Sequence, residues 1–342
     1  MTDTGLPDAS PATASAASAA SDVDAVAGRY RAFAAAQAAG SSPTLCRWAV
    51  AVAEDPELLA LLAPLPAAKQ QPNLLFAAAR LHGARPGDVR SLRALLTTRW
   101  PAVRATVLAR ATQTNEAARC AALLLGLRHV PGPVALLEVG AAAGLCLIPD
   151  RFSYTFGDDG PRLDPVDGPS PVTLPVRLGD GLVAPTVMPD IVWRAGLDLN
   201  PLNPADPDTL DWLRTLVWPE HQARRDRLAA AAALAAEHRV RVRAGDLRTD
   251  ALEALASRAP GDATLVVTHS AALAYLDAPA RREAVDRVTA LGARRVGFEA
   301  RGVDPAVPPL ARPVTPATLF VAALDGTPFA VADGHCTVLA LP

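Results

Sequence analysis

The feature that most constrains this chain is a change of hydrophobic periodicity at Pro131-Gly132-Pro133. From residue 22 to about residue 130, apolar residues recur every three to four positions, which is typical of amphipathic helices. After the break, short apolar runs of strand length alternate with helical segments. Such alternation predicts a mostly parallel sheet with helices on both faces. We therefore expect an α/β protein with a helical domain over residues 22–130 and a sheet domain over residues 131–342.

The sheet domain is expected to contain five parallel strands and a closing antiparallel hairpin. The strands are predicted at 134–139, 190–198, 240–243, 264–267 and 295–299, and the helices between them at 219–237, 250–258 and 279–291. The hairpin is predicted from two β-rich runs, 318–323 and 329–341, which flank the turn dipeptide Asp325-Gly326.

Two other segments do not follow the alternation. A proline-rich stretch at about 152–189 predicts an inserted flap, with antiparallel strands at 152–156 and 172–178. In the first half, a long helix is expected from Pro101 to about Arg128, because proline suits a first helical turn. Residues 1–21 are rich in Ala, Ser, Thr and Pro and lack a basic start, which predicts a disordered tail rather than a secretory signal.

Composition narrows the class of ligand. The net charge is −2, aromatics are only 4% of residues, and Lys69 is the one lysine, so we expect no nucleic-acid partner. No apolar run reaches the ~20 residues that span a bilayer, so no membrane association is expected. The four scattered cysteines form no C-x-x-C pair, which predicts reduced thiols, no metal site and a cytoplasmic location. A neutral or zwitterionic small molecule is the expected substrate.

The strongest motif runs from Glu138 to Gly144, where an apolar strand ends in an acid and a turn of small residues follows. Small residues let a ligand approach the backbone closely. The pattern resembles the first motif of S-adenosylmethionine-dependent methyltransferases, with Gly140 and Gly144 in place and Ala142 at the middle glycine. A dinucleotide fingerprint would need glycine where Leu145 stands. An ordinary tight turn between a strand and a helix is the alternative.

Later strand ends follow the order of the same family. Asp198 resembles the acid that binds ribose hydroxyls, Asp246 the residue that binds the adenine amino group, and His269 lies where an acceptor-side base is expected. Asp198 follows the glycine turn at more than the usual ~20 residues, so Asp158 and Asp159 stay alternative ribose acids. The resemblance implies S-adenosylmethionine as cofactor on a Rossmann-like, methyltransferase-type sheet, with contacts from Glu138, Gly140, Ala142, Gly144, Asp198 and Asp246.

A polar group precedes the break in a region otherwise rich in Ala and Leu. Gln113, Asn115 and Glu116 are expected to bind substrate over the strand ends, although such residues also cap helices. Over the whole chain, a narrower resemblance is carried by six segments: 71–76, 112–116, 138–145, 150–154, 216–220 and 269–271. Together they look like the bacterial family called domain of unknown function 2332, from about Tyr30 to Glu299. Because Pro149 follows Gly144 by five residues, the first helix after the turn must be short or kinked.

Two other functional classes fit parts of the pattern. A serine hydrolase could use Ser270, Asp325 and His335, which occur in the order of that fold, but Thr268 and Ala272 stand where the nucleophile turn needs glycines. A non-catalytic ligand-binding protein could keep the sheet without turnover. The expected function is S-adenosylmethionine binding, with methyl transfer to a small molecule. The sequence names neither the acceptor nor an oligomeric state.

Overall fold

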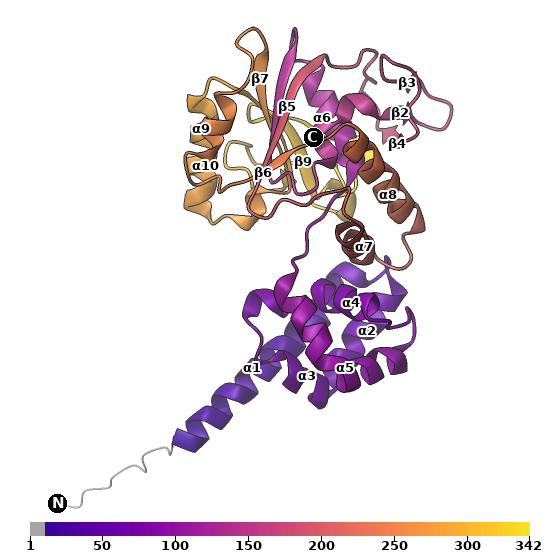
Figure 1. The fold of residues 1–342 in the computed structure, drawn as a ribbon, viewed down its shortest axis with the longest axis vertical. Helices are drawn as coiled ribbons and strands as arrows, with labels where there is room; N and C mark the ends of the chain where they lie inside the picture. Colours follow the sequence, from indigo (N-terminus) through magenta and orange to yellow (C-terminus); the bar gives the residue numbers. More distant parts are fainter. Residues whose placement is uncertain (1–10) are drawn as a thin grey trace, which may run out of the picture. The chain divides into compact units, whose positions relative to one another are not determined.

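A computed structural model describes residues 11–342 and divides the chain into two compact units (Figure 1). The helical unit contains the residues up to Gln113 together with Asp211–Ala223, and the sheet unit contains Thr114–Leu210 and Arg224–Pro342. The sequence placed the division between residues 130 and 131. Of the expected disordered tail, residues 1–10 lie outside the described residues, whereas residues 11–21 belong to the first helix.

The helical unit is built on five α-helices: α1 (Pro11–Phe33), α2 (Pro43–Glu54), α3 (Pro56–Leu62), α4 (Pro72–Leu81) and α5 (Val89–Ala109). Its core is aromatic. Phe76 makes edge contacts with Tyr30 and Trp48 at ring-centroid distances of 5.8 and 5.5 Å. Trp212, from the returning segment Asp211–Ala223, is buried in the same core. The predicted helical character of this half is therefore confirmed.

The long helix predicted from Pro101 to Arg128 is wrong. Helix α5 begins at Val89, where Asp88 caps it by accepting from the Ser91 N–H, and it passes through Pro101 with a kink at Arg99. Proline removes one helical hydrogen bond and crowds the preceding turn, which the kink relieves. The chain then runs irregularly to Glu116, and a separate helix, α6 (Cys120–Leu127), follows.

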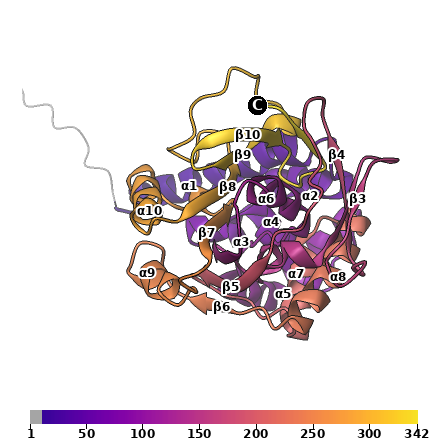
Figure 2. The same cartoon turned by 90° about the horizontal axis from the view of Figure 1, so that it is seen from above.

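The sheet unit contains eleven strands in one mostly parallel sheet, in the order β3-β2-β4-β11-β10-β9-β8-β7-β1-β5-β6 (Figure 2). Their bounds are β1 (Val134–Val139), β2 (Ser153–Phe156), β3 (Arg162–Leu163), β4 (Thr173–Leu178), β5 (Ile191–Asp198), β6 (Val242–Ala244), β7 (Thr264–Ser270), β8 (Arg294–Ala300), β9 (Phe320–Leu324), β10 (Thr327–Ala332) and β11 (Val338–Ala340). The five predicted parallel strands are confirmed as β1, β5, β6, β7 and β8.

The closing hairpin is also confirmed. Strands β9 and β10 pair antiparallel around Asp325 and Gly326, whose φ angles of 51° and 83° suit the hairpin turn that this dipeptide predicts. The inserted flap differs from the prediction, because β2 and β4 pair in parallel and only β3 is antiparallel to β2. Strand β4 buries Leu174 and Val176 and pairs with β11, so the insertion extends the main sheet.

Helices cover both faces of the sheet unit. Helices α9 (Ala251–Ala256) and α10 (Ala278–Ala290) pack on one face, where Leu252 and Val288 meet Leu137 and Val267. Helix α6 lies on the other face against β8 and β9 (Figure 1). The two remaining α-helices are α7 (Pro207–Leu216) and α8 (Gln222–Glu237). Among residues 11–342, no helix is both long and apolar enough to cross a membrane.

Candidate ligand site

The carboxyl ends of β1, β5, β6 and β7 bring most of the predicted site residues to one edge of the sheet unit. Glu138 of β1 pairs with Gly196 on one side and with Thr268 on the other. Asp198, two residues after Gly196, pairs with Ala244 of β6. Because these strands are parallel, the segments that follow them converge at this edge.

The turn after β1 has an unusual backbone. Gly140, Ala142 and Gly144 have φ angles of 71°, 48° and 72°, so the alanine at the middle position adopts a left-handed conformation that favours glycine. A Cβ on Gly140 would lie 2.5 Å from Ala272 Cβ, and one on Gly144 would lie 2.5 Å from Val240 Cγ1. Both glycines are therefore required by the packing of the fold itself.

No α-helix follows this turn. The chain instead makes two 3₁₀ turns, Leu145–Leu147 and Pro149–Arg151, which confirms the expectation drawn from Pro149. Proline at residue 149 cannot donate the hydrogen bond that would continue a helix from Gly144. The site consequently lacks the long helix whose N-terminus would hold a pyrophosphate.

Asp198 is bonded directly to the turn. Its Oδ2 accepts from the Ala142 N–H at 2.8 Å, and its Oδ1 accepts from the Asn200 N–H at 2.8 Å. Each carboxylate oxygen can accept a further hydrogen bond. Asp158, one of the alternative acids, is exposed in the loop between β2 and β3. In the sheet, seven strands lie between β2 and β5. The structure thus brings Asp198, and not Asp158, to the glycine turn.

Asp246 lies next to Asp198, because the Gly245 N–H donates to the Asp198 carbonyl at 3.0 Å. The carboxylate of Asp246 forms an ion pair with Arg248, with 2.6 Å between Nη2 and Oδ2. Hydrogen bonds from the Arg248 side chain and backbone hold the pKa of Asp246 below its usual value. A ligand amino group at this place would compete with Arg248 for the carboxylate.

Glu138 belongs to strand β1, which precedes the turn, and 4% of its surface is exposed. Its Oε2 has no hydrogen-bond partner among the described residues. Burial, with added repulsion from Cys146 and Asp198, raises its pKa well above the usual value. Burial therefore favours the protonated form of this carboxyl.

His269, the predicted base, is 2% exposed and connects β7 to β8. Its Nδ1 lies 2.8 Å from Glu299 Oε1 and its Nε2 lies 2.9 Å from Arg295 Nη1. Arginine only donates, so Nε2 accepts and the proton is on Nδ1. With both nitrogens occupied, no ring nitrogen is left to take a proton from a substrate. The role of His269 as a base stays a prediction, and its ring is held by two residues of β8.

The three residues predicted to bind substrate belong to different units. Gln113 belongs to the helical unit, whereas Asn115 and Glu116 belong to the sheet unit. Asn115 Oδ1 accepts from the Ala143 N–H at 2.9 Å, which joins it to the glycine turn. Glu116 is buried and accepts from Arg224 Nε at 2.7 Å and Arg227 Nε at 3.1 Å. Burial raises the pKa of Glu116, but the two guanidiniums more than offset it, so the pKa lies below its usual value.

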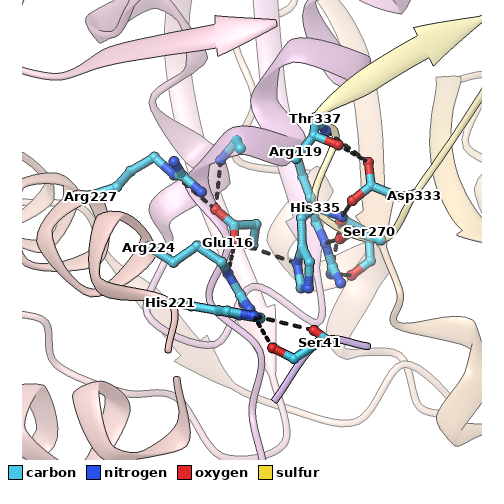
Figure 3. Close-up of polar contacts among 12 residues, drawn as sticks. Ser41, Glu116, Arg119, His221, Arg224, Arg227, Ser270, Asp333, His335 and Thr337 are labelled. Carbon is cyan, nitrogen blue, oxygen red and sulfur yellow. Dashed lines mark hydrogen bonds and ion pairs between the residues drawn. The ribbon is translucent and has the colours of Figure 1, made fainter. Parts of the chain in front are cut away.

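Sequence reasoning missed the basic residues around Glu116 (Figure 3). Arg119 Nε donates to the Gly334 carbonyl at 3.0 Å, and its Nη1 donates to both oxygens of Ser270 at 3.2 Å. His335 Nδ1 lies 3.5 Å from Glu116 Oε2. Burial and the nearby Arg224 lower the pKa of His335 to about 4, so its ring is neutral at pH 7. Arg224 and Arg227 lie three positions apart on α8, a spacing that is too common in helices to predict a cluster.

The serine-hydrolase arrangement is not assembled. Ser270 Oγ accepts from Arg119, and Ser270 pairs with Phe298 at the end of β8. Asp325 instead bonds Arg294 and the Arg295 N–H at the start of β8. Three to four residues of strand, roughly 10–13 Å, therefore separate Ser270 from Asp325. Among residues 11–342, no group of three His, Cys, Asp or Glu residues is arranged to hold a metal ion.

Comparison with known proteins identifies the family but no activity. No curated protein matches the chain at a significant level. A crystal structure of a possible exported protein from Bordetella parapertussis is similar at 17% identity, covering 88% of this chain and 75% of that one, with a TM-score of 0.27. That score is too low to support a conclusion about fold or location. A family model described as "uncharacterized protein conserved in bacteria" (DUF2332) matches residues 27–336, and the chain therefore belongs to this family.

Proposed function

We propose that the sheet unit binds S-adenosylmethionine at the Gly140–Gly144 turn and that the protein transfers its methyl group to a small molecule. The observation that carries the proposal is the 2.8 Å hydrogen bond between Asp198 and the Ala142 N–H. This bond joins a carboxylate to the turn, and a carboxylate that can accept further hydrogen bonds supports the proposed contact with the two ribose hydroxyls.

The strand order supports this position. In chain order, the parallel strands β6-β5-β1-β7-β8 read third, second, first, fourth and fifth. That is the order of nucleotide-binding sheets, in which ligands lie beyond the carboxyl ends where the order reverses, next to the first strand. The glycine turn, Asp198 and Asp246 all follow strands on or beside that point.

The absence of an α-helix directly after Gly144 bears on whether the site would take a dinucleotide or an adenosyl ligand. A nicotinamide dinucleotide needs a helix N-terminus for its pyrophosphate, and the 3₁₀ turns after Gly144 do not supply one. An adenosyl sulfonium has no phosphate and needs only the turn, the ribose acid and an adenine contact. Tyr275, an exposed aromatic, lies in the 3₁₀ turn after β7 at the same edge.

In the reaction, the bond from the methyl carbon to sulfur breaks as the bond to the acceptor forms, and the sulfonium becomes a neutral thioether. Such a transfer depends mainly on holding the two reactants in line. Ligand binding without methyl transfer is the second candidate, and it is favoured by one observation, namely that both nitrogens of His269 are occupied.

Titration calorimetry of the full chain with S-adenosylhomocysteine tests the binding. We expect saturable one-to-one binding and no heat with NADH. Absence of adenosyl binding at millimolar ligand would overturn the proposal. Transfer of labelled methyl to a pool of small molecules, with Asp198→Asn as the negative control, then separates methyl transfer from binding alone.

A further inference from the structure

Arg119 is a buried cation without an acidic partner. It is 6% exposed, and its bonds go to neutral oxygens, the Gly334 carbonyl and the two oxygens of Ser270. Among the described residues it forms no ion pair with a carboxylate; its guanidinium lies 5.6 Å from the centre of the Phe320 ring. Burial raises the pKa of the nearby Glu138 well above its usual value, which disfavours the charged form as a partner for Arg119. A buried guanidinium is costly unless an anion pairs with it.

Arg227 also has unused donors. Its Nε donates to Glu116, and within residues 11–342 its two terminal nitrogens have no protein partner, although only 16% of its side chain is exposed. Arg224 binds the same carboxylate through Nε. Arg224 and Arg227 therefore share the single carboxylate of Glu116, while Arg119 contacts Ser270 and Gly334 nearby (Figure 3).

Within residues 11–342, the other titratable groups of this cluster form no ion pair with Arg119 or Arg227. His335 is neutral, with a pKa of about 4. Asp333 is used by its own turn, where it accepts from the His335 N–H at 3.1 Å and from the Thr337 N–H at 2.8 Å.

The cluster lies at the same edge as the glycine turn. Arg119 bonds Ser270, the last residue of β7. Asn115, adjacent to Glu116, bonds the Ala143 N–H of the turn at 2.9 Å. The arginines and the proposed adenosyl site are thus connected by direct contacts within the sheet unit.

We propose that Arg119, Arg224 and Arg227 form a subsite for a compact oxyanion, a carboxylate or phosphate group carried by the methyl acceptor. The guanidinium fork matches both groups and binds them in a bidentate manner. The positive charge of the guanidiniums repels the sulfonium, so the subsite holds the acceptor rather than the reacting centre of the cofactor. The identity of the ligand as the acceptor rests on the proposed function; the anion subsite itself does not.

The test uses inorganic phosphate and acetate as probes on the full chain, with chloride keeping the ionic strength constant. Calorimetry and thermal shift should show saturable binding of one or both anions. Arg227→Gln should weaken that binding about tenfold or more, because it removes charge-assisted donors. Arg227→Lys, which keeps the charge but loses the fork, should recover only part of it. Glu116→Gln should tighten binding, because it removes the internal competitor for the same guanidiniums. Arg282→Gln, an exposed arginine on α10, is the matched control and should bind as the wild type.

Binding that is absent, or unchanged in Arg227→Gln, would overturn the subsite. Weaker binding in Glu116→Gln, with a folded protein by circular dichroism, would show that the cluster is structural and would also overturn it. A second titration uses protein saturated with S-adenosylhomocysteine. Retained anion binding supports an acceptor subsite, whereas exclusion of the anion assigns the arginines to the cofactor's own carboxylate and overturns the acceptor assignment. Anion binding without any adenosyl binding overturns the proposed function while leaving the anion subsite intact.

Discussion

Asp198 accepts a hydrogen bond from the backbone N–H of Ala142 at 2.8 Å, although 56 residues separate them in the chain. The acid that ends β5 and the turn that ends β1 are therefore one structural feature. Asp198 has two roles available to it, support of the turn and contact with a ligand, and substitutions must separate them.

Asp198→Asn is the substitution that separates these roles, because asparagine keeps an acceptor for the Ala142 N–H and removes the charge. We expect the affinity for S-adenosylhomocysteine to fall by about ten- to a hundredfold, as for the loss of hydrogen bonds to a charged group. The melting temperature should fall only slightly, because asparagine keeps the acceptor for the Ala142 N–H and loses the one for the exposed Asn200 N–H. Asp158→Asn, in the exposed loop between β2 and β3, is the control and should leave affinity unchanged. Calorimetry showing the reverse pattern would move the ribose contact to the inserted segment.

Ala142→Gly should stabilise the protein. Ala142 holds a φ of 48°, which is strained for a residue with a Cβ and ordinary for glycine. The relief should raise the free energy of unfolding by about 0.5–1 kcal/mol, measured by urea denaturation. Gly140→Ala should do the opposite and by a larger amount, because its Cβ would meet Ala272 Cβ at 2.5 Å. A loss of stability in Ala142→Gly would mean that packing of the methyl group outweighs the backbone strain.

Ser270 should not react as a nucleophile. Its Oγ accepts from Arg119, and Asp325 lies at the start of β8, far from the end where Ser270 sits. We expect no labelling of the wild type by a fluorophosphonate probe. Labelling that disappears in Ser270→Ala would establish the hydrolase class instead.

Stability should fall in acid through His335. Burial and Arg224 lower the folded-state pKa of His335 to about 4, below its unfolded value of about 6.5. Between these values the unfolded chain binds a proton that the folded protein does not, so stability falls as the pH drops from about 6.5 to 4. His335→Gln should flatten this part of the curve, measured by urea denaturation at a series of pH values. Glu116, whose folded pKa is also lowered, adds a further loss at the acid end. Parallel curves for the two proteins would contradict the assignment.

Sequence patterns correctly predicted those elements whose structure depends on neighbouring residues, namely single strands and tight turns. The run Val134–Val139 is buried at every position and is a strand, and Asp325-Gly326 is a hairpin turn because its backbone angles suit that dipeptide. The flap was predicted as antiparallel because its pairing with β11, at the other end of the chain, leaves no local signal. The kinked helix α5 was missed because tertiary packing tolerates Pro101 inside it.

For the candidate site, the sequence predicted that the glycine turn and Asp198 lie close together. The glycine turn and Asp198 follow strands, so chain order and sheet rules were enough to bring them together. Glu116 and its partner Arg224 are 108 residues apart, and nothing in either segment predicts their contact. The partners of the His269 ring, Glu299 and Arg295, come from the neighbouring strand β8, and no local pattern around His269 predicts them.

The discontinuous helical unit has a consequence for synthesis of the chain on the ribosome. Its core includes Trp212, which is buried but lies in a segment that is translated after β1 to β5. The helices that precede residue 113 therefore cannot complete their core until Asp211–Ala223 has emerged, so the first half of the protein finishes folding only after much of the second half has been made. A chain cut at residue 113 would leave both products defective, one with a gap in its core and the other with Trp212 and Trp218 exposed to water.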